Sequence, residues 1–240
     1  MPSGPSPTVG RVEAATPVVE CRTCGAGAPV HEHFCKQCSR ILSLGRHGDY
    51  FAFLGLPRRL GLDLQDLERR FRDLSRQLHP DFFYNAPQAE RLASLERSSY
   101  LNDAYRTLRD PSTRTEHLLT IEGLGPTRVE GGHGTVPPSL LEEVFELNEQ
   151  LDEIRELREG GSAAADVRTR LEAAAGPIEA RRAAYEARTA TLTEQWDVLA
   201  PDAGAPERRA TLNALRECLL ERNYINNLLA TIEREVHAHG

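Results

Sequence analysis

Apolar residues recur at helical spacing along most of this 240-residue chain. Between Asp63 and Leu78 they stand three or four residues apart, which places them on one face of an α-helix. They are Leu64, Leu67, Phe71, Leu74 and Leu78. A second run, from Pro87 to about Arg109, repeats the spacing with Leu101, Ala104, Tyr105 and Leu108. Two amphipathic helices joined by a short turn are expected to pack antiparallel as a hairpin.

The turn of this hairpin reads His79-Pro80-Asp81, and we expect it at an exposed tip. Proline fixes φ and disfavours helix at the residue before it, so the turn is rigid. Asp81 can cap the next helix or accept hydrogen bonds from a partner's arginine. At least one aromatic residue of 82–84 is expected to anchor the turn. The polar face of the first helix is basic, through Arg69, Arg72 and Arg76, with Arg70 flanking them.

The segments around the hairpin predict two more short helices. Asp49 suits an N-cap ahead of the aromatic cluster 50–54. A strand is the alternative there, but no partner strand stands nearby. Asp110-Pro111 ends the long helix, and residues 112–121 predict another short one. The glycine-rich stretch 122–138 predicts a linker.

Four cysteines near the N-terminus form two Cys-x-x-Cys pairs, separated by ten residues. They are Cys21, Cys24, Cys35 and Cys38. Four thiolates match the tetrahedral preference of zinc, and iron also accepts such a set. A module this small depends on its ion for folding. His31 and His33 lie between the pairs, and because four cysteines complete a site, we expect neither to be a ligand.

Three long apolar-periodic stretches between 139 and 240 predict an antiparallel three-helix bundle. Ser139 with Glu142 fits a capping box at the start of the first helix. Gly176-Pro177 is expected to break or kink the second helix. The lone Cys218 fits packing better than chemistry.

An apolar pair stands beside the core stripe of the first bundle helix. Leu141 and Phe145 are four residues apart, and Glu146 and Glu149 lie next to them. Exposed apolar groups ringed by carboxylates are typical of a partner-binding surface. A third helix covering the pair is the alternative, and the pattern alone favours neither.

Composition narrows the possible functions. The net charge is −7, and the acidic excess lies in the C-terminal half, which argues against a nucleic-acid surface there. No apolar run is long enough to span a bilayer, and we see no secretory signal or transit peptide, so a cytoplasmic protein is expected. No phosphate-binding loop or nucleophile elbow is present, so we do not expect an enzyme.

These patterns predict an all-α chain with a small metal-binding knuckle module ahead of a helical hairpin and a bundle. The expected organisation is a disordered leader (1–20), the four-cysteine module (21–44), the hairpin domain (46–121), a linker (122–138) and the bundle (139–240).

The basic helix followed by His-Pro-Asp and a second helix resembles the J-domain, which activates DnaK-class chaperone ATPases. With the acidic bundle behind it, the chain is similar to HscB-type (Hsc20 family) cochaperones of iron–sulfur cluster assembly. The likeness is carried by residues 74–83 (LSRQLHPDFF), 101–108 (LNDAYRTL) and 146–154 (ELNEQLDEI). The cysteine module resembles the zinc-binding extension of some members.

The resemblance implies two partners. The His79-Pro80-Asp81 turn and its arginines would bind an HscA/DnaK-class chaperone and stimulate its ATPase. The bundle would bind an IscU-type cluster scaffold and deliver it, through Leu141, Phe145, Glu146 and Glu149, with Tyr224 at the aromatic position of the last helix. Glu142 departs from the family, since that position is usually apolar.

Two other readings stay open from the residues alone. A zinc-stabilised nucleic-acid-binding protein would use the arginine face, and its affinity for DNA would fall steeply with salt. A thiol oxidoreductase would need a reactive Cys21 or Cys35.

Overall fold

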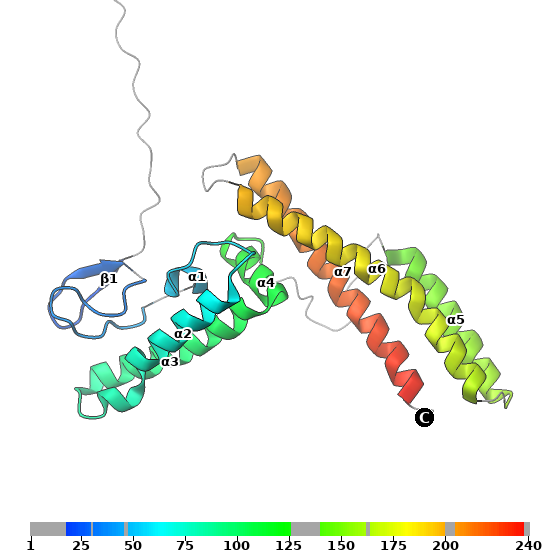
Figure 1. The fold of residues 1–240 in the computed structure, drawn as a ribbon, viewed down its shortest axis with the longest axis horizontal. Coiled ribbons are helices and arrows are strands. Elements are labelled where there is room, and N and C mark those ends of the chain that lie inside the picture. Colours follow the sequence, from blue (N-terminus) through cyan, green and yellow to red (C-terminus); the bar gives the residue numbers. More distant parts are fainter. Residues whose placement is uncertain are drawn as a thin grey trace, which may run out of the picture. The chain divides into compact units, whose positions relative to one another are not determined.

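The structure, a computed structural model, describes residues 18–29, 31–45, 48–125, 140–161, 164–199 and 205–237. Described residues of Met1–Pro57 and Gln65–Arg106 form one compact unit, and those of Arg58–Leu64 and Thr107–Gly240 form the other. Helices make up most of both units, so the predicted all-α class is confirmed (Figure 1). Across the described ranges, no helix combines the length and apolar character needed to cross a bilayer.

The first unit begins with a small sheet that the sequence did not predict. Strands β1 (Val18–Glu20) and β2 (Gly27–Pro29) pair antiparallel, with Val19 opposite Ala28. The predicted leader, 1–20, is therefore wrong for its last three residues, which are ordered by pairing with β2. The rest of that segment lies outside the described residues.

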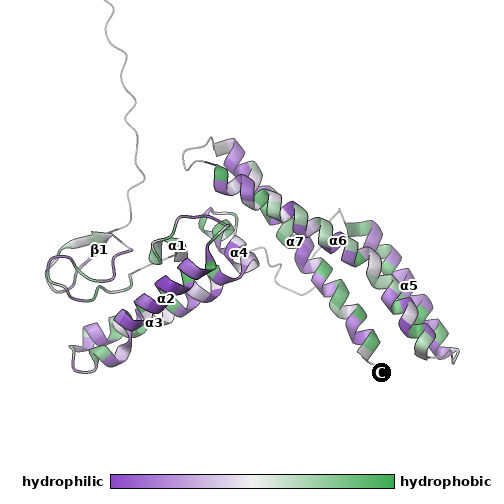
Figure 2. Cartoon of the chain, viewed as in Figure 1, coloured by the Kyte–Doolittle hydropathy of each residue, from purple (hydrophilic) through white to green (hydrophobic). Residues whose placement is uncertain are grey.

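Four helical segments follow: α1 (Tyr50–Phe53), α2 (Leu64–Leu78), the 3₁₀ turn η1 (Pro80–Phe83) and α3 (Gln88–Arg109). Asp49 caps α1 as predicted, accepting a hydrogen bond from the Ala52 N–H at 3.1 Å. Helices α2 and α3 lie side by side as a hairpin (Figure 1). Hydrophilic residues cover the outer side of α2 (Figure 2).

Polar as well as apolar contacts hold the hairpin together. The hydroxyls of Ser94 and Ser98, on α3, donate to the Leu78 carbonyl at 2.7 and 2.8 Å. These bonds satisfy a carbonyl that the end of α2 would otherwise leave without a partner. Phe71 stacks on Tyr105, with ring centroids 4.3 Å apart. The end of α2 is thereby fixed where the His79 turn begins.

Helix α4 (Pro111–Ile121) opens the longer part of the second unit. The Asp110 side chain caps it, accepting from the Ser112 and Thr113 N–H groups at 3.0 and 2.9 Å. Pro111 at the first helical position fits, because its missing N–H would have no partner there. Both the predicted stop of the preceding helix and the predicted short helix are confirmed.

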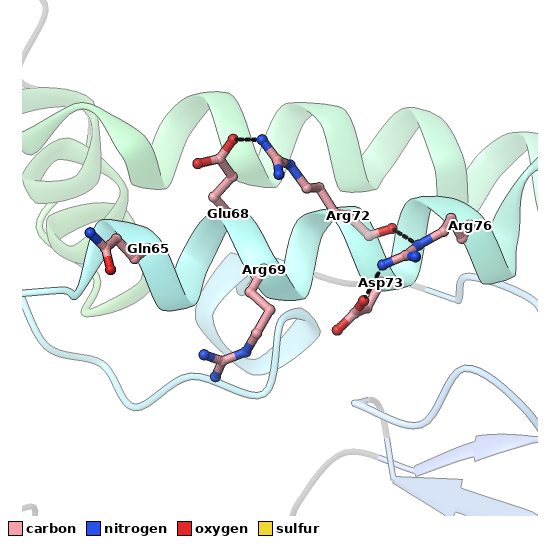
Figure 3. A pocket seen from close by; sticks show the side chains of 6 residues that line it. All are labelled: Gln65, Glu68, Arg69, Arg72, Asp73 and Arg76. Carbon is pink, nitrogen blue, oxygen red and sulfur yellow. Dashed lines mark hydrogen bonds and ion pairs between the residues drawn. The ribbon is translucent and has the colours of Figure 1, made fainter.

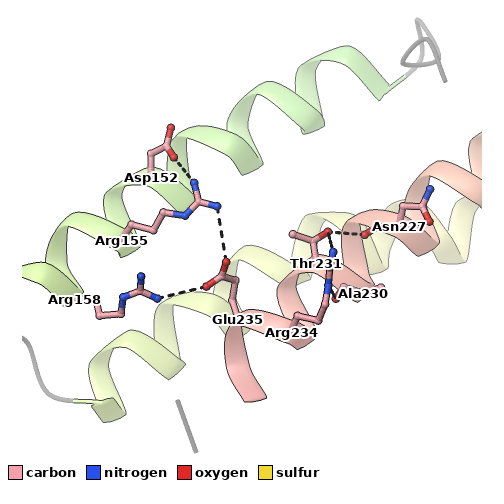
Figure 4. Close-up of polar contacts among 8 residues, drawn as sticks. All are labelled: Asp152, Arg155, Arg158, Asn227, Ala230, Thr231, Arg234 and Glu235. Carbon is pink, nitrogen blue, oxygen red and sulfur yellow. Dashed lines mark hydrogen bonds and ion pairs between the residues drawn. The ribbon is translucent and has the colours of Figure 1, made fainter. Parts of the chain in front are cut away.

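The bundle consists of α5 (Leu141–Glu159), α6 (Ala164–Val198) and α7 (Ala205–His237). The apolar spacing predicts a core stripe for α5, of which all members but the partly buried Val144 are buried: Leu140, Val144, Leu147, Leu151 and Ile154. Arg155 and Arg158 also pair with Glu235 of α7, at 3.8 and 3.6 Å (Figure 4).

The break expected at Gly176-Pro177 is wrong, while the kink expected there as the alternative stays a prediction. Helix α6 runs without interruption through Pro177. Ala174 and Ile178 are buried, whereas Gly176 and Pro177 are not. Packing on both sides of the proline therefore offsets the backbone hydrogen bond that proline cannot donate, and the helix continues. The N-cap of α5 is Leu140, with no side-chain cap. Ser139, the expected cap, lies outside the described residues.

The loop Arg58–Leu64 is fastened to the end of α6 within the second unit. The indole N–H of Trp196 donates to the Arg58 carbonyl at 2.9 Å. The Asp197 carboxylate accepts from the N–H groups of Leu60 and Gly61, both at 2.7 Å. Since backbone amides in a loop need partners, Asp197 replaces the water that would otherwise bind them.

Candidate functional site

The four cysteines converge as predicted. Their Sγ atoms all lie within 4.8 Å of one another, and two pairs, Cys21–Cys38 and Cys24–Cys35, are separated by 3.6 Å. A tetrahedral zinc site with Zn–S bonds of about 2.3 Å has sulfur–sulfur edges of about 3.8 Å. A disulfide would require about 2.05 Å. The donor set therefore fits a metal ion.

The two cysteine pairs repeat one backbone arrangement. The N–H groups of Gly25 and Ser39 donate to the carbonyls of Cys21 and Cys35, both at 2.8 Å. Gly25 and Ser39 have positive φ, 74° and 57°, so each turn folds back tightly. Each pair is thus a knuckle that presents two thiols on the same side.

Backbone N–H groups inside the knuckles stabilise thiolates. Hydrogen bonds from Cys24 and Thr23 lower the pKa of Cys21 to about 6. Hydrogen bonds from Cys38 and Gln37 likewise lower the pKa of Cys35. Thiolate, not thiol, is the form that binds metals. The first cysteine of each knuckle is therefore prepared for coordination.

The second cysteine of each knuckle behaves differently. The Ala26 N–H lowers the pKa of Cys24, but burial and the surrounding thiols outweigh it and raise the value to about 12. The pKa of Cys38 is also raised. Several anions this close repel one another unless a cation neutralises them. The cluster thus has the electrostatics of a cation site.

The group of converging ligand atoms consists of the four sulfurs and includes neither histidine between the knuckles. His31 is exposed and lies 3.8 Å from Glu32. The His33 ring contacts the hairpin, where its Nδ1 lies 2.8 Å from Arg97 Nη1.

The His79-Pro80-Asp81 turn lies at the hairpin tip, as expected. His79 and Asp81 are 52% and 87% exposed. The cap of this turn is His79 and not Asp81, because the Asp81 N–H donates to His79 Nδ1 at 3.3 Å. Phe83 is partly buried and can anchor the turn, whereas Phe82 and Tyr84 are exposed.

Three of the predicted arginines share the solvent face of α2. Arg69, Arg72 and Arg76 are 68–75% exposed, and they border a shallow hollow with Gln65 (Figure 3). Each pairs with a carboxylate on its own helix: Arg69 with Asp66, Arg72 with Glu68 at 2.5 Å, and Arg76 with Asp73 at 2.6 Å. Each of these exposed cations thus has a carboxylate neighbour on α2.

Arg70 differs from its neighbours. Its Nη1 donates to the carbonyls of Leu54 and Gly55, at 3.2 and 3.0 Å, and its Nε to Asp66 at 2.9 Å. These carbonyls end α1, so Arg70 ties α1 to α2. Its geometry indicates a structural contribution that the sequence pattern did not predict.

On the bundle, the predicted scaffold-binding pair is open to solvent. Leu141 is 56% exposed and Phe145 is 72% exposed, with Glu146 and Glu149 exposed beside them. No described helix covers the pair, which decides against the alternative that a third helix buries it. Tyr224, on α7, is half-buried.

Sequence reasoning missed one fully buried arginine, Arg97 of α3. It stands four residues before Leu101, on the apolar stripe of that helix. An arginine at an otherwise apolar position could have indicated a buried cation.

Comparison with known proteins agrees with this geometry. Residues 49–117 match the DnaJ domain family. The human co-chaperone protein HscB has a similar crystal structure, with a TM-score of 0.58 and 26% identity over 90% of this chain and 98% of that one. Chaperone HscB from Vibrio cholerae is 28% identical over 78% of this chain and 99% of that one, with a TM-score of 0.49.

The DnaJ match covers the hairpin with its exposed His79 turn, and the human structure extends over the bundle and most of the remaining chain. The chain contains a J-domain, carries a four-cysteine module ahead of it, and is similar in structure to an HscB co-chaperone.

Proposed function

We propose that this cochaperone serves iron–sulfur cluster assembly by stimulating the ATPase of an HscA/DnaK-class chaperone and delivering an IscU-type scaffold to it. The observation that carries the proposal is the exposed His79-Pro80-Asp81 turn at the tip of a hairpin that matches the DnaJ domain. Arg69, Arg72 and Arg76 would add Coulomb attraction to the same partner.

The scaffold would bind at the apolar pair of α5. Leu141 and Phe145 supply apolar surface, Glu146 and Glu149 a charged rim, and Tyr224 an aromatic contact from α7. Interfaces of this kind concentrate their binding free energy in a few large side chains. Glu142 is exposed in the same turn, where other family members usually have an apolar residue. The scaffold would therefore bind here in a slightly different position than it does in those members.

We further propose that the four cysteines bind one zinc ion, with iron as the alternative occupant, and that the protein acts in the cytoplasm. When bound, the ion supplies folding free energy to the module. Reduced thiols are typical of a cytoplasmic compartment.

The decisive experiment measures single-turnover ATP hydrolysis by a purified DnaK-class chaperone, with this protein, a cluster scaffold, or both. We expect this protein to accelerate hydrolysis and the scaffold to increase the effect. No acceleration at saturating concentrations of both would refute the proposed function.

A further inference from the structure

Arg97 is a cation placed inside the first unit. Its side chain is 0% exposed. Burial lowers the pKa of Arg97 to about 10, which leaves the guanidinium charged at neutral pH. A buried charge is strongly destabilising unless hydrogen-bond partners compensate it. The identity of those partners therefore matters for the stability of α3.

The hydrogen-bond partners of Arg97 belong to the cysteine module. Nε donates to the Leu42 carbonyl at 2.6 Å, and Nη2 to the Ser43 carbonyl at 3.1 Å. Nη1 donates to His33 Nδ1 at 2.8 Å, because a guanidinium has no acceptor. None of these three partners is a carboxylate, so the charge is held by neutral groups of the module.

These acceptors are positioned by the second knuckle. The Leu42 N–H donates to the His33 carbonyl at 3.0 Å, which pairs the two chain segments that lead to and from the knuckle. Leu42 also lies in one buried cluster with Cys21 and Cys35. A core this small does not fold without its metal ion. The positions of the three acceptors thus depend on the occupied site.

The same region closes the core around α1. The His33 ring meets Phe53 edge-on, with centroids 4.8 Å apart, and the guanidinium of Arg97 lies 5.9 Å from the Phe53 ring. Phe53 is 0% exposed, and it also contacts Tyr100 of α3 edge-on, with centroids 4.8 Å apart. Removing the module would expose this aromatic cluster.

We infer that occupancy of the four-cysteine site controls the packing of the J-domain through Arg97. With an ion bound, the module supplies acceptors to the guanidinium and covers Phe53. Without the ion, the acceptors are lost, Arg97 is left without compensation, and α1 and the middle of α3 loosen. The inference rests on the proposed metal site but not on the proposed chaperone or scaffold, and the metal content of the loaded protein distinguishes a missing site from a missing coupling.

Hydrogen–deuterium exchange on the full-length protein tests this. The zinc-loaded protein is compared with protein stripped by a chelator under reducing conditions, and zinc is then returned. We expect amides of 50–54 and 93–104 to exchange about tenfold faster or more after stripping, because charge-assisted hydrogen bonds are lost. Helix α6, in the other compact unit, serves as the internal reference. Return of zinc should restore protection.

A pair of variants isolates the arginine. Arg97→Met introduces an apolar side chain of similar length and thereby removes the buried charge. In this variant, removal of the metal should change exchange at 93–104 by no more than about twofold. Arg91→Met, on the exposed side of the same helix, should respond as the wild type does.

Two results would overturn the inference. The first is a stripped wild type in which amides of the module exchange faster while those of α1 and α3 exchange as before. This comparison tests the inference even if Arg97→Met fails to fold. The second is a folded Arg97→Met protein whose α3 responds to stripping as fully as that of the wild type.

Discussion

His79 shapes its own turn while its ring stays accessible. Nδ1 caps the turn through the Asp81 N–H, and half of the side chain meets solvent. Pro80 fixes φ next to it. A partner therefore meets a preformed turn, and little conformational entropy is lost on binding.

Replacing His79 with Gln should abolish stimulation of the chaperone ATPase with little change in stability. The residue packs on no core, and surface substitutions usually change the free energy of unfolding by less than about 0.5 kcal/mol. Thermal melts and single-turnover hydrolysis would be measured together. His31→Gln, the same change at another exposed histidine, should leave both unchanged. Full stimulation by the His79 variant would remove the turn from the interface.

Two adjacent arginines, Arg69 and Arg70, should differ in how much they contribute to the free energy of unfolding. Arg70→Ala removes two hydrogen bonds from a charged donor to the end of α1, and should cost about 2 kcal/mol in urea unfolding. Arg69→Ala should cost less than about 0.5 kcal/mol, because exposed pairs contribute little. The opposite order of the two costs would contradict this assignment.

Reversing Arg72 and Arg76 to Glu should weaken chaperone binding, because their Coulomb attraction becomes repulsion. The wild-type affinity should fall as salt is added, and the affinity of the double variant should depend on salt less. Binding isotherms at two salt concentrations measure both. Equal affinities for the two proteins at low salt would exclude the arginine face from the interface.

Sequence reasoning at the residue scale worked where side-chain chemistry decides position. The four cysteines and the exposed turn were predicted from residue type and spacing. The structural contacts of Arg70 and Arg97 were not predicted, because both side chains donate to backbone carbonyls. Any residue offers a carbonyl, so the sequence contains no partner to recognise.

Among the helices, α4 depends visibly on its cap. The N–H groups of Thr113 and Ser112 lower the pKa of Asp110 by donating to its carboxylate. A depressed pKa means that the folded state favours the ionised form, so the stabilisation is present above the ordinary pKa of aspartate and is lost in more acidic solution. Asp110→Asn should unfold more readily than the wild type at neutral pH, and the difference should shrink toward about pH 3. Urea melts at several pH values measure it, and a constant difference would contradict it.

On α5, truncating Leu141 and Phe145 to Ala should leave folding nearly intact and weaken scaffold binding by about 2 kcal/mol or more. Both side chains are mostly exposed, so little burial is lost. Leu147→Ala, on the buried stripe of the same helix, is the control and should cost about 2–5 kcal/mol of stability. A melt and a scaffold titration for each variant separate the two cases. Intact affinity of the double variant would place the interface elsewhere.

Helix boundaries could be predicted because capping and apolar spacing are local. Asp49 marked one helix start and Asp110-Pro111 one helix end correctly. The run through Pro177 could not be foreseen, since it depends on contacts of Ala174 and Ile178 with distant residues. The strands β1 and β2 have three residues each, too few for an alternating pattern to stand out.

For the molecule as a whole, one ion per chain is expected. Elemental analysis of protein purified under reducing conditions should find about one zinc per chain, and Cys35→Ser should lower this content. Cys218→Ser removes a buried thiol of α7 that lies outside the cluster, and should leave metal content unchanged. Wild-type protein free of metal would contradict the proposed site.

The predicted domain borders follow sequence signals, whereas the compact units follow contacts. The DnaJ match, 49–117, begins in one unit and ends in the other, and the loop Arg58–Leu64 groups with the bundle. Trp196 and Asp197 contribute to that grouping, because their hydrogen-bond partners lie in this loop. Such pairing across more than a hundred residues leaves no periodic pattern in the sequence, and the predicted domain borders stay a prediction.

The contact between Asp197 and Gly61 bears on how this family can change over time. A Cβ built on Gly61 would lie 2.7 Å from Asp197 Oδ2, so a larger residue there would push the carboxylate out of its present position, from which it accepts two hydrogen bonds. A related protein that loses the glycine must also change or move the aspartate. The two positions, 136 residues apart, should therefore vary together among homologues.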